Sequence, residues 1–438
     1  MNKLSAITNV FRTLRYRNYR LFFGGQLISL IGTWMQQVAL TWLVYRLTNS
    51  ALLLGVVGFA SQMPTFLFGP FAGVLADRMN RHRIIILTQT LSMVQAAVLS
   101  VLTFTGHIEV WHIIMLSFFL GLVNAFDMPT RQSFVLDMIE NREDLGNAIA
   151  LNSSMFNGAR LIGPSIAGLV IAALGEGLCF LLNAISYLAV IIALLAMKVS
   201  RQQSSPERPG VFAEFREGFG YVTRSVPIRS ILLLIVVVST MGLQYTILMP
   251  IFARDILRGG PNTLGFLMGA TGVGAVIGAL VLASRKTVRG LARWIPMAAG
   301  TFGVGLVGFA LSKDFALSLV LLLVTGFGMM VQLASSNTIL QTIADDDKRG
   351  RVMSFYVMSF MGVAPFGSLL AGALASEFGA PATLVVSGFV CMVGAVIFAT
   401  RLPGIRKEIR PIYARLGIIP EVSAGVQAAT HLTMPPGD

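Results

Sequence analysis

Few side chains in this sequence could form ion pairs or carry protons in an apolar setting, and most of them lie in two short stretches. The first is Gly73-Val-Leu-Ala-Asp77-Arg78-Met-Asn-Arg81-His-Arg83, between two apolar runs. The second holds Asp127 and Arg131, four residues apart and therefore on one face of a helix. Because a charge at bilayer depth costs several kcal/mol, both stretches are predicted at a membrane boundary. Their charged residues are therefore candidates for a functional role beyond fixing topology.

Arg160 is an isolated cation near the middle of another apolar run, with no acidic residue beside it. A cation at that depth is usually functional or paired. One interpretation is that Arg160 attracts an anionic substrate group or responds to a nearby proton. The equal alternative is a structural arginine bonded to helix carbonyls or to Asn and Gln side chains.

Neutral polar residues recur at helical spacing in the first apolar run and predict one wet helix face. With polar residues of later runs they are expected to line a central cavity for an amphipathic organic molecule rather than a small ion. For each residue alone, hydrogen bonding between helices is an equal alternative. The candidates are Gln26, Thr33 and Gln37 in the first run and Asn152, Asn157, Gln244, Tyr245 and Gln332 further along.

The composition excludes a water-soluble globular protein. Of 438 residues, 55% are hydrophobic and 12% are charged, and the mean hydropathy is +0.75. The net charge of +13 does not indicate a nucleic-acid partner, because the cations cluster just beyond apolar runs and not along one face with interleaved aromatics. The chain is predicted to be an integral membrane protein whose partner is the lipid bilayer.

Twelve apolar runs are long enough to cross about 30 Å of hydrocarbon as helices. None shows the alternating segments of about ten residues that a membrane β-barrel requires. The fold class is therefore predicted as all-α, with twelve transmembrane helices. The runs lie at 21–45, 51–75, 84–104, 111–129, 147–173, 178–197, 230–252, 263–284, 294–311, 316–336, 352–376 and 382–400.

An even number of spans puts both termini on one side, and the basic residues identify that side as the cytoplasm. The only Lys and Arg residues in or beside the loops on the opposite side are Arg46, Arg254, Arg258 and Lys313. The predicted order is a lead-in at 1–20, a six-helix half at 21–197, a linker with an amphipathic helix at 198–229, a second six-helix half at 230–400 and a tail at 401–438, partly disordered.

The two halves share sequence features. Leu54-Gly55-Val-Val-Gly58-Phe-Ala60 opens span 2, and Leu264-Gly265-Phe-Leu-Met-Gly269-Ala270 opens span 8. Likewise, the charged segment at 139–146 after span 4 is matched by that at 343–350 after span 10. We predict two pseudo-symmetric bundles with a substrate site between them near mid-membrane.

The motif around Asp77 resembles the signature of the loop between helices 2 and 3 in the major facilitator superfamily. The stretches at 124–132, 147–153 and 157–168 resemble the bacterial exporters related to the enterobactin exporter. This resemblance implies proton-driven efflux of siderophores or drug-like molecules from the cytoplasm. It also implies that Gly163, Pro164 and Gly168 pack span 5 against span 8.

The same resemblance implies a cytoplasmic latch. Asp77 would meet the N-terminal end of span 11, where the helix dipole favours an anion, and Arg81 would pair with Asp127. The alternative is that the cations, Arg78 among them, only fix topology. The second half has no acid at the position of Asp77, so the latch is predicted to be one-sided.

No cofactor, metal site or enzyme activity is expected. Gly269, Gly272, Gly274 and Gly278 resemble a dinucleotide turn only faintly, and close helix packing is favoured because no strand precedes them. We predict a monomeric secondary transporter of the bacterial inner membrane that exports a hydrophobic or siderophore-like molecule, coupled to protons by resemblance. The alternatives are a lysophospholipid flippase and a non-transporting sensor or scaffold.

Overall fold

The computed structural model describes residues 12–139, 141–197, 211–285, 287–416 and 418, with the backbone alone at 70, 73–78, 136, 142 and 211–215. The described part contains twelve helical spans that are long and apolar enough to cross a membrane, and no strands. The predicted fold class and the number of spans are confirmed.

The first half consists of six helices joined by short turns. Gly175, with a φ of 83°, allows the tight turn between the last two of them, and the Asn80 side chain caps the third by accepting a hydrogen bond from Arg83 N at 3.2 Å. The helices are α2 (Arg17–Thr48), α3 (Ala51–Arg78), α4 (Arg81–Phe104), α5 (Val110–Asp137), α6 (Leu145–Leu174) and α7 (Glu176–Leu195).

The second half repeats six spans, but two of them contain π-helical turns. Span 7 consists of α9 (Val226–Val237), η3 (Val238–Gly242), α10 (Tyr245–Ile251) and η4 (Phe252–Ile256). Span 11 consists of α14 (Arg349–Val357), η5 (Met358–Gly362) and α15 (Ala364–Phe378). The other spans are α11 (Pro261–Ala283), α12 (Leu291–Leu311), α13 (Phe315–Ile343) and α16 (Ala380–Arg415). Such turns loosen the regular hydrogen-bond pattern and often accompany functional sites.

Three short segments lie together at one end of the molecule, which we call the linker side. They are η1 (Arg12–Arg15), α8 (Val211–Arg224) and the end of α16. Helix α8 occupies the segment for which an amphipathic helix is predicted. In α16 the helix continues to Arg415, and Ile405, Ile409 and Tyr413 form a buried stripe on it.

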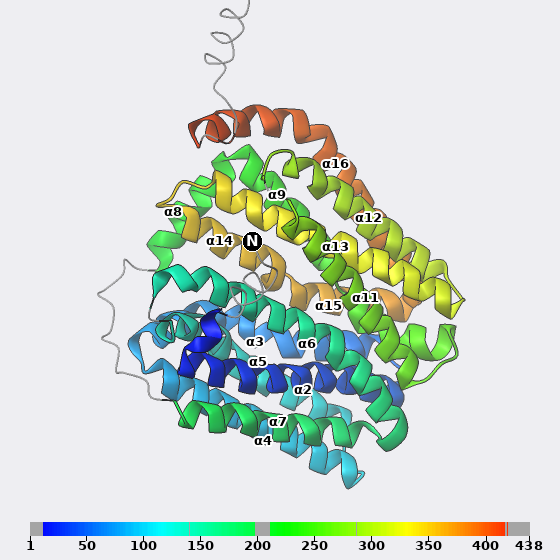
Figure 1. The fold of residues 1–438 in the computed structure, drawn as a ribbon. Coiled ribbons are helices and arrows are strands. Elements are labelled where there is room, and N and C mark those ends of the chain that lie inside the picture. Colours follow the sequence, from blue (N-terminus) through cyan, green and yellow to red (C-terminus); the bar gives the residue numbers. More distant parts are fainter. Residues whose placement is uncertain (1–11, 140, 198–210, 286, 417, 419–438) are drawn as a thin grey trace, which may run out of the picture.

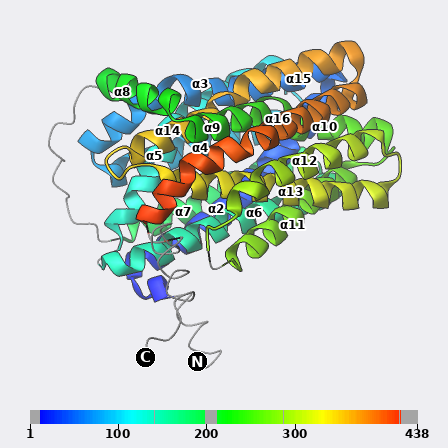
Figure 2. The same cartoon turned by 90° about the horizontal axis from the view of Figure 1, so that it is seen from above.

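The two halves stack on each other, with α2–α7 on one side and α9–α16 on the other (Figure 1). The helices of both halves run in broadly the same direction, so the two bundles lie side by side along their lengths (Figure 2). The end opposite the linker side carries the tight turns after α2, α6 and α15, and we call it the short-loop side. Helices α6 with α11, and α3 with α15, form the main contacts between the halves.

Candidate functional site

Glycines on the short-loop side let α6 and α11 touch backbone to backbone. A Cβ atom added to Gly168 would lie 2.7 Å from the Pro261 carbonyl oxygen and 3.0 Å from Gly265 Cα. One added to Gly265 would lie 2.7 Å from the Pro164 carbonyl oxygen. Small residues at such crossings bring helix backbones close enough for dispersion contacts to hold them in lipid. Pro164 and Gly168 thus pack α6 against α11, whereas Gly163 packs against Trp34 and Ile31 of α2.

The other pair of helices, α3 and α15, closes the same side in the same way. A Cβ added to Gly55 would lie 2.7 Å from the Ser368 carbonyl oxygen and 2.9 Å from Gly372 Cα. Gly55 belongs to the repeated segment that opens span 2, and Gly265 to its counterpart in span 8. The sequence repeat therefore coincides with two equivalent contacts between the halves.

Polar side chains reinforce this closed end. Arg254 Nη1 donates to Asn49 Oδ1 at 2.7 Å, and the Tyr45 hydroxyl donates to Asp255. Tyr45 is buried, and Asp255 lies in η4 at the end of span 7. In the part of the chain that the structure describes, each hydrogen bond between the halves lies at this end or near mid-membrane.

The halves separate toward the linker side, as one face of α6 demonstrates. Leu161, Pro164 and Gly168 on this face contact α11. On the same face nearer the linker side, Ser153 and Ser154 are exposed. Because this face of α6 is covered by the second half at one end and exposed at the other, the two halves diverge along it. The structure is closed on the short-loop side and open on the linker side.

Arg160 lies where this separation begins. Its guanidinium Nη2 is 3.7 Å from Met329 Sδ of α13, in the other half, and its Cζ lies 5.8 Å from the centre of the Trp34 ring. Within the described residues, no carboxylate lies within 4.0 Å of it. Tyr245 of the other half lies near Arg160, and its buried hydroxyl has no hydrogen-bond partner among the described residues.

Two of the polar residues predicted on span 7 and span 10 are buried in the second half. Gln244 donates to the Ser239 carbonyl oxygen at 3.1 Å and accepts from Ser368 Oγ at 2.8 Å, and Ser368 in turn accepts from Gln62 of α3 at 3.1 Å. Gln332 is fully buried, and neither polar atom of its amide has a partner. A series of hydrogen-bonded side chains therefore crosses between the halves through Gln62, a residue that sequence reasoning missed.

The predicted polar face of span 1 is divided between two environments. Gln26 is buried, and Thr33 donates to the Ser29 carbonyl oxygen at 2.9 Å, whereas Gln37 is exposed. On α6, Asn152 is half-buried, and Asn157 donates to the Ser153 carbonyl oxygen at 2.9 Å. Gln37, Asn152 and Asn157 can therefore meet water or a ligand, Thr33 bonds within its own helix, and the buried Gln26 Oε1 has no hydrogen-bond partner among the described residues.

The predicted pairing of gating residues is only partly correct. Asp127 pairs with Arg131 at 2.7 Å, as their spacing indicates. Arg81, however, pairs with Asp137 at 3.0 Å, and the predicted Arg81–Asp127 pair is wrong. Helices α4 and α5 are antiparallel neighbours, so the start of α4 meets the end of α5. Ten residues of helix, about 15 Å, separate that end from Asp127. The side chains of Asp77 and Arg78 lie outside the described part of the structure.

Asp127 occupies a site built for a carboxylate. It is 3% exposed and accepts hydrogen bonds from Thr88 Oγ1 at 2.8 Å and Gln89 Nε2 at 2.9 Å, besides its ion pair with Arg131. Both carboxylate oxygens therefore have partners inside the protein. Asp127 is a buried acid within the α5 span, and these partners all lie in the first half.

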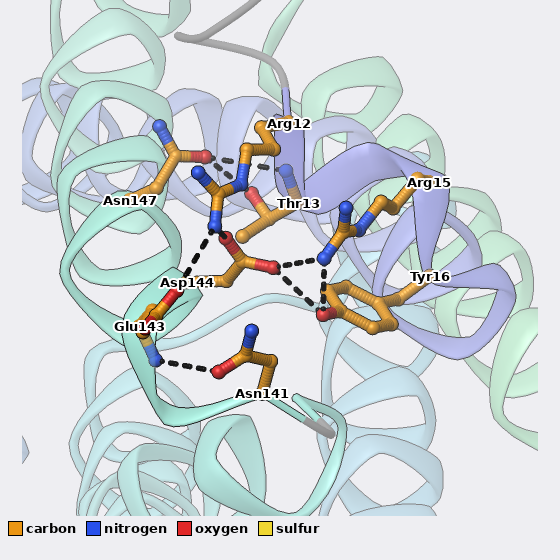
Figure 3. Close-up of polar contacts among 8 residues, drawn as sticks. All are labelled: Arg12, Thr13, Arg15, Tyr16, Asn141, Glu143, Asp144 and Asn147. Carbon is orange, nitrogen blue, oxygen red and sulfur yellow. Dashed lines mark hydrogen bonds and ion pairs between the residues drawn. The ribbon is translucent and has the colours of Figure 1, made fainter.

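On the linker side, Asp144 ties the segment before α2 to the start of α6 (Figure 3). Its carboxylate is 1% exposed, accepts from the Tyr16 hydroxyl at 2.7 Å and pairs with Arg15 at 2.6 Å and with Arg12. Thr13 adds a 2.7 Å hydrogen bond to Asn147 Oδ1. We call this group the tyrosine clasp. Sequence reasoning interpreted these arginines as topology signals and missed it.

The second half has an equivalent contact. Tyr221 of α8 donates to Asp345 Oδ2 at 3.1 Å, in the segment between α13 and α14. Glu217 of α8 pairs with Arg351 at 2.6 Å and with Lys348, and these hydrogen bonds hold the pKa of Glu217 below its usual value. Each half thus has a tyrosine ahead of its first span that binds the loop before its fifth span. The repeat of the 139–146 and 343–350 segments was the signal that could have revealed it.

The tyrosine clasp is expected to depend on pH. The Tyr16 hydrogen bond, with attraction from Arg12 and Arg15, holds the pKa of Asp144 below its usual value. Because the pKa is lowered on folding, the clasp is fully formed above the unfolded pKa of about 3.9 and is lost as pH falls through the lowered value. Tyr16→Phe should move this loss to higher pH, measured by amide hydrogen exchange of residues 12–16 against wild type at matched pH. Glu143→Gln, at an exposed carboxylate 3.9 Å from Arg12, should not move it.

The sequence pattern of the transmembrane secretion effector family matches residues 8–415. The staphyloferrin A transporter of Staphylococcus aureus is 27% identical over 87% of this chain and 96% of its own length. The multidrug efflux pump Tap of Mycolicibacterium fortuitum is 26% identical over 84% of this chain and 92% of its own.

Among solved structures, a bacterial homologue of the human lysosomal transporter Spinster, in an inward-facing and unoccupied conformation, superposes with a TM-score of 0.71. It is 14% identical, and the match covers 90% of this chain and 98% of that one. At that identity the likeness concerns the fold.

Proposed function

We propose an export function for this chain, which belongs to the transmembrane secretion effector family of the major facilitator superfamily. It is therefore a multi-pass membrane transporter of organic molecules and not an enzyme. The compounds that we propose it exports are siderophore-like or drug-like. Export would proceed across the bacterial inner membrane by alternating access. The observation that carries this proposal is the face of α6 that is sealed against α11 at Gly168 and exposed at Ser153.

The orientation we propose places the linker side in the cytoplasm. The distribution of Lys and Arg supports it, since few of them fall in the loops of the short-loop side. In this orientation the described conformation is open to the cytoplasm and ready to load substrate. Export then requires the short-loop contacts to open and the linker side to close, with Asp77 and the Arg81–Asp137 pair at the closing edge.

The side chains of α2 and α6 where the halves separate suit a molecule with an apolar body and polar groups. Trp34 and Phe156 meet edge to face, with ring centres 5.8 Å apart, and Phe156 is 46% exposed on α6. Gln37 and Asn157 offer neutral donors and acceptors nearby in the first half. The relatives named for staphyloferrin A and for drugs support this class.

We propose proton antiport as the energy source and Asp127 as the proton carrier. Its burial inside a span supports this role, because acidic residues inside membrane spans commonly mark proton pathways. We expect the protein to transport as a monomer, because the contacts that must open and close lie between the two halves of one chain.

An efflux assay tests the proposal. Cells that lack the protein and cells that overproduce it would be compared for accumulation of siderophores and cationic dyes. We expect overproduction to lower accumulation about tenfold and expect collapse of the pH gradient to abolish that difference, because a proton moving down its gradient supplies free energy for an uphill step. Equal accumulation of each compound in both strains would contradict export. Export that persists without a pH gradient would contradict antiport alone.

A further inference from the structure

We propose that Arg160 and Tyr245 together bind a carboxylate of the exported molecule at the point where the two halves part. This inference rests on the proposed export function and adds a chemical class to it, an organic anion with an apolar body. Arg160 comes from the first half and Tyr245 from the second. A carboxylate held between them would therefore connect the two bodies that must move.

The hydrogen-bonding capacity of Arg160 is mostly unused. A guanidinium offers five N–H donors, and the polar partner within reach is the Met329 sulfur at 3.7 Å, a weak acceptor. The ring of Trp34 lies 5.8 Å away on another side of the guanidinium. A charge in such surroundings is costly unless it is paired. In the described residues no acid neutralises it, so an anion from outside is the missing partner.

The second half contributes further unpartnered donors at this level. Tyr245 is 0% exposed, and its hydroxyl, which lies near Arg160 and Thr271, has no hydrogen-bond partner among the described residues. Gln332 lies on α13 three residues after Met329, about one helical turn on. Its side chain is also 0% exposed with both polar atoms unpartnered. Buried polar groups are normally satisfied, so this concentration of them indicates a ligand.

The position of Arg160 makes it reachable. It lies one residue before Leu161, which contacts Gly272 of α11, and four residues after the exposed Phe156. A molecule that enters from the linker side would pass Phe156 before it meets the guanidinium. A carboxylate matches that guanidinium because it can accept two parallel N–H bonds. A cationic group at the same place would be repelled.

Paired probes test the inference in membrane vesicles that contain the full chain. The probes are a fluorescent compound with a single carboxylate and its uncharged methyl ester, with a cationic dye as a third substrate. We expect wild type to export the carboxylate faster than the ester. Arg160→Gln should lower export of the carboxylate about tenfold and leave the ester unchanged, while Arg160→Lys should recover part of the loss. Tyr245→Phe should lower carboxylate export severalfold.

Met329→Leu is the matched control, since it removes the sulfur but keeps an apolar side chain of similar size. It should export both probes as wild type does, and the amount of each variant in the vesicles confirms folding. The inference is overturned if Arg160→Gln lowers both probes equally or neither, or if wild type exports the ester and the cationic dye but not the carboxylate. Failure of wild type to export any of the three contradicts the proposed function itself.

Discussion

Gly168→Val is expected to abolish export while the protein still reaches the membrane. A Cβ at this position would lie 2.7 Å from the Pro261 carbonyl oxygen and 3.0 Å from Gly265 Cα, and both of these atoms belong to backbone. Backbone cannot rotate aside as a side chain can, so the two helices must move apart. The short-loop side then cannot close, and the transporter loses the state that is open to the linker side.

The control lies on the same helix. A Cβ added to Gly158 meets nothing within 4 Å, so Gly158→Val changes helix propensity equally without pressing on α11. We expect Gly158→Val to export at nearly the wild-type rate.

A reporter cysteine separates a conformational effect from simple loss of activity. Ala51 is 8% exposed, and its carbonyl oxygen lies 2.8 Å from a Cβ added to Gly372 across the other contact between the halves. With Ala51→Cys in place, an impermeant thiol reagent should label the Gly168→Val protein about tenfold faster than the control. The natural Cys179 and Cys391 are buried and should give little background. Equal labelling, or normal export by Gly168→Val, would contradict the role of this contact.

The spans and the duplication could be predicted from sequence because each depends on local composition. Twenty or so apolar residues form a helix in lipid whatever surrounds them, since backbone groups must be satisfied within the segment. The glycines at 269, 272, 274 and 278 were correctly interpreted as packing positions. Gly272 faces Leu161 of α6, and Gly274 faces Leu323 of α13. Their position inside an apolar run with no strand before them was sufficient to decide these cases.

Partners on different helices were harder to predict. The choice between Asp127 and Asp137 as partner of Arg81 depends on where α4 and α5 cross, and both acids lie on the same helix. The tyrosine clasp joins Tyr16 to Asp144, 128 residues away in the chain. Neither follows from periodicity. The duplicated halves offered one indirect clue, because a contact found in one half can be sought in the other.

Asp127→Asn is expected to lower export at least tenfold and to remove its dependence on the pH gradient. Asparagine keeps the size of the side chain and can still accept from Thr88 and Gln89 through its oxygen. It cannot bind and release a proton, and it leaves Arg131 without its ion-pair partner. The side chain of Arg131 is 23% exposed, so water compensates part of this loss and the protein should still fold.

Three further variants decide whether the carboxylate acts as a proton carrier or only as a structural partner. Asp127→Glu keeps an ionisable group and should retain part of the export that depends on the gradient. Thr88→Val removes one hydrogen bond to the carboxylate and should lower the export that depends on the gradient without abolishing it. Glu377→Gln, at an exposed acid near the end of α15, should behave as wild type. If Asp127→Asn still responds fully to the pH gradient, another group carries the proton, because an amide cannot replace the carboxylate in that step.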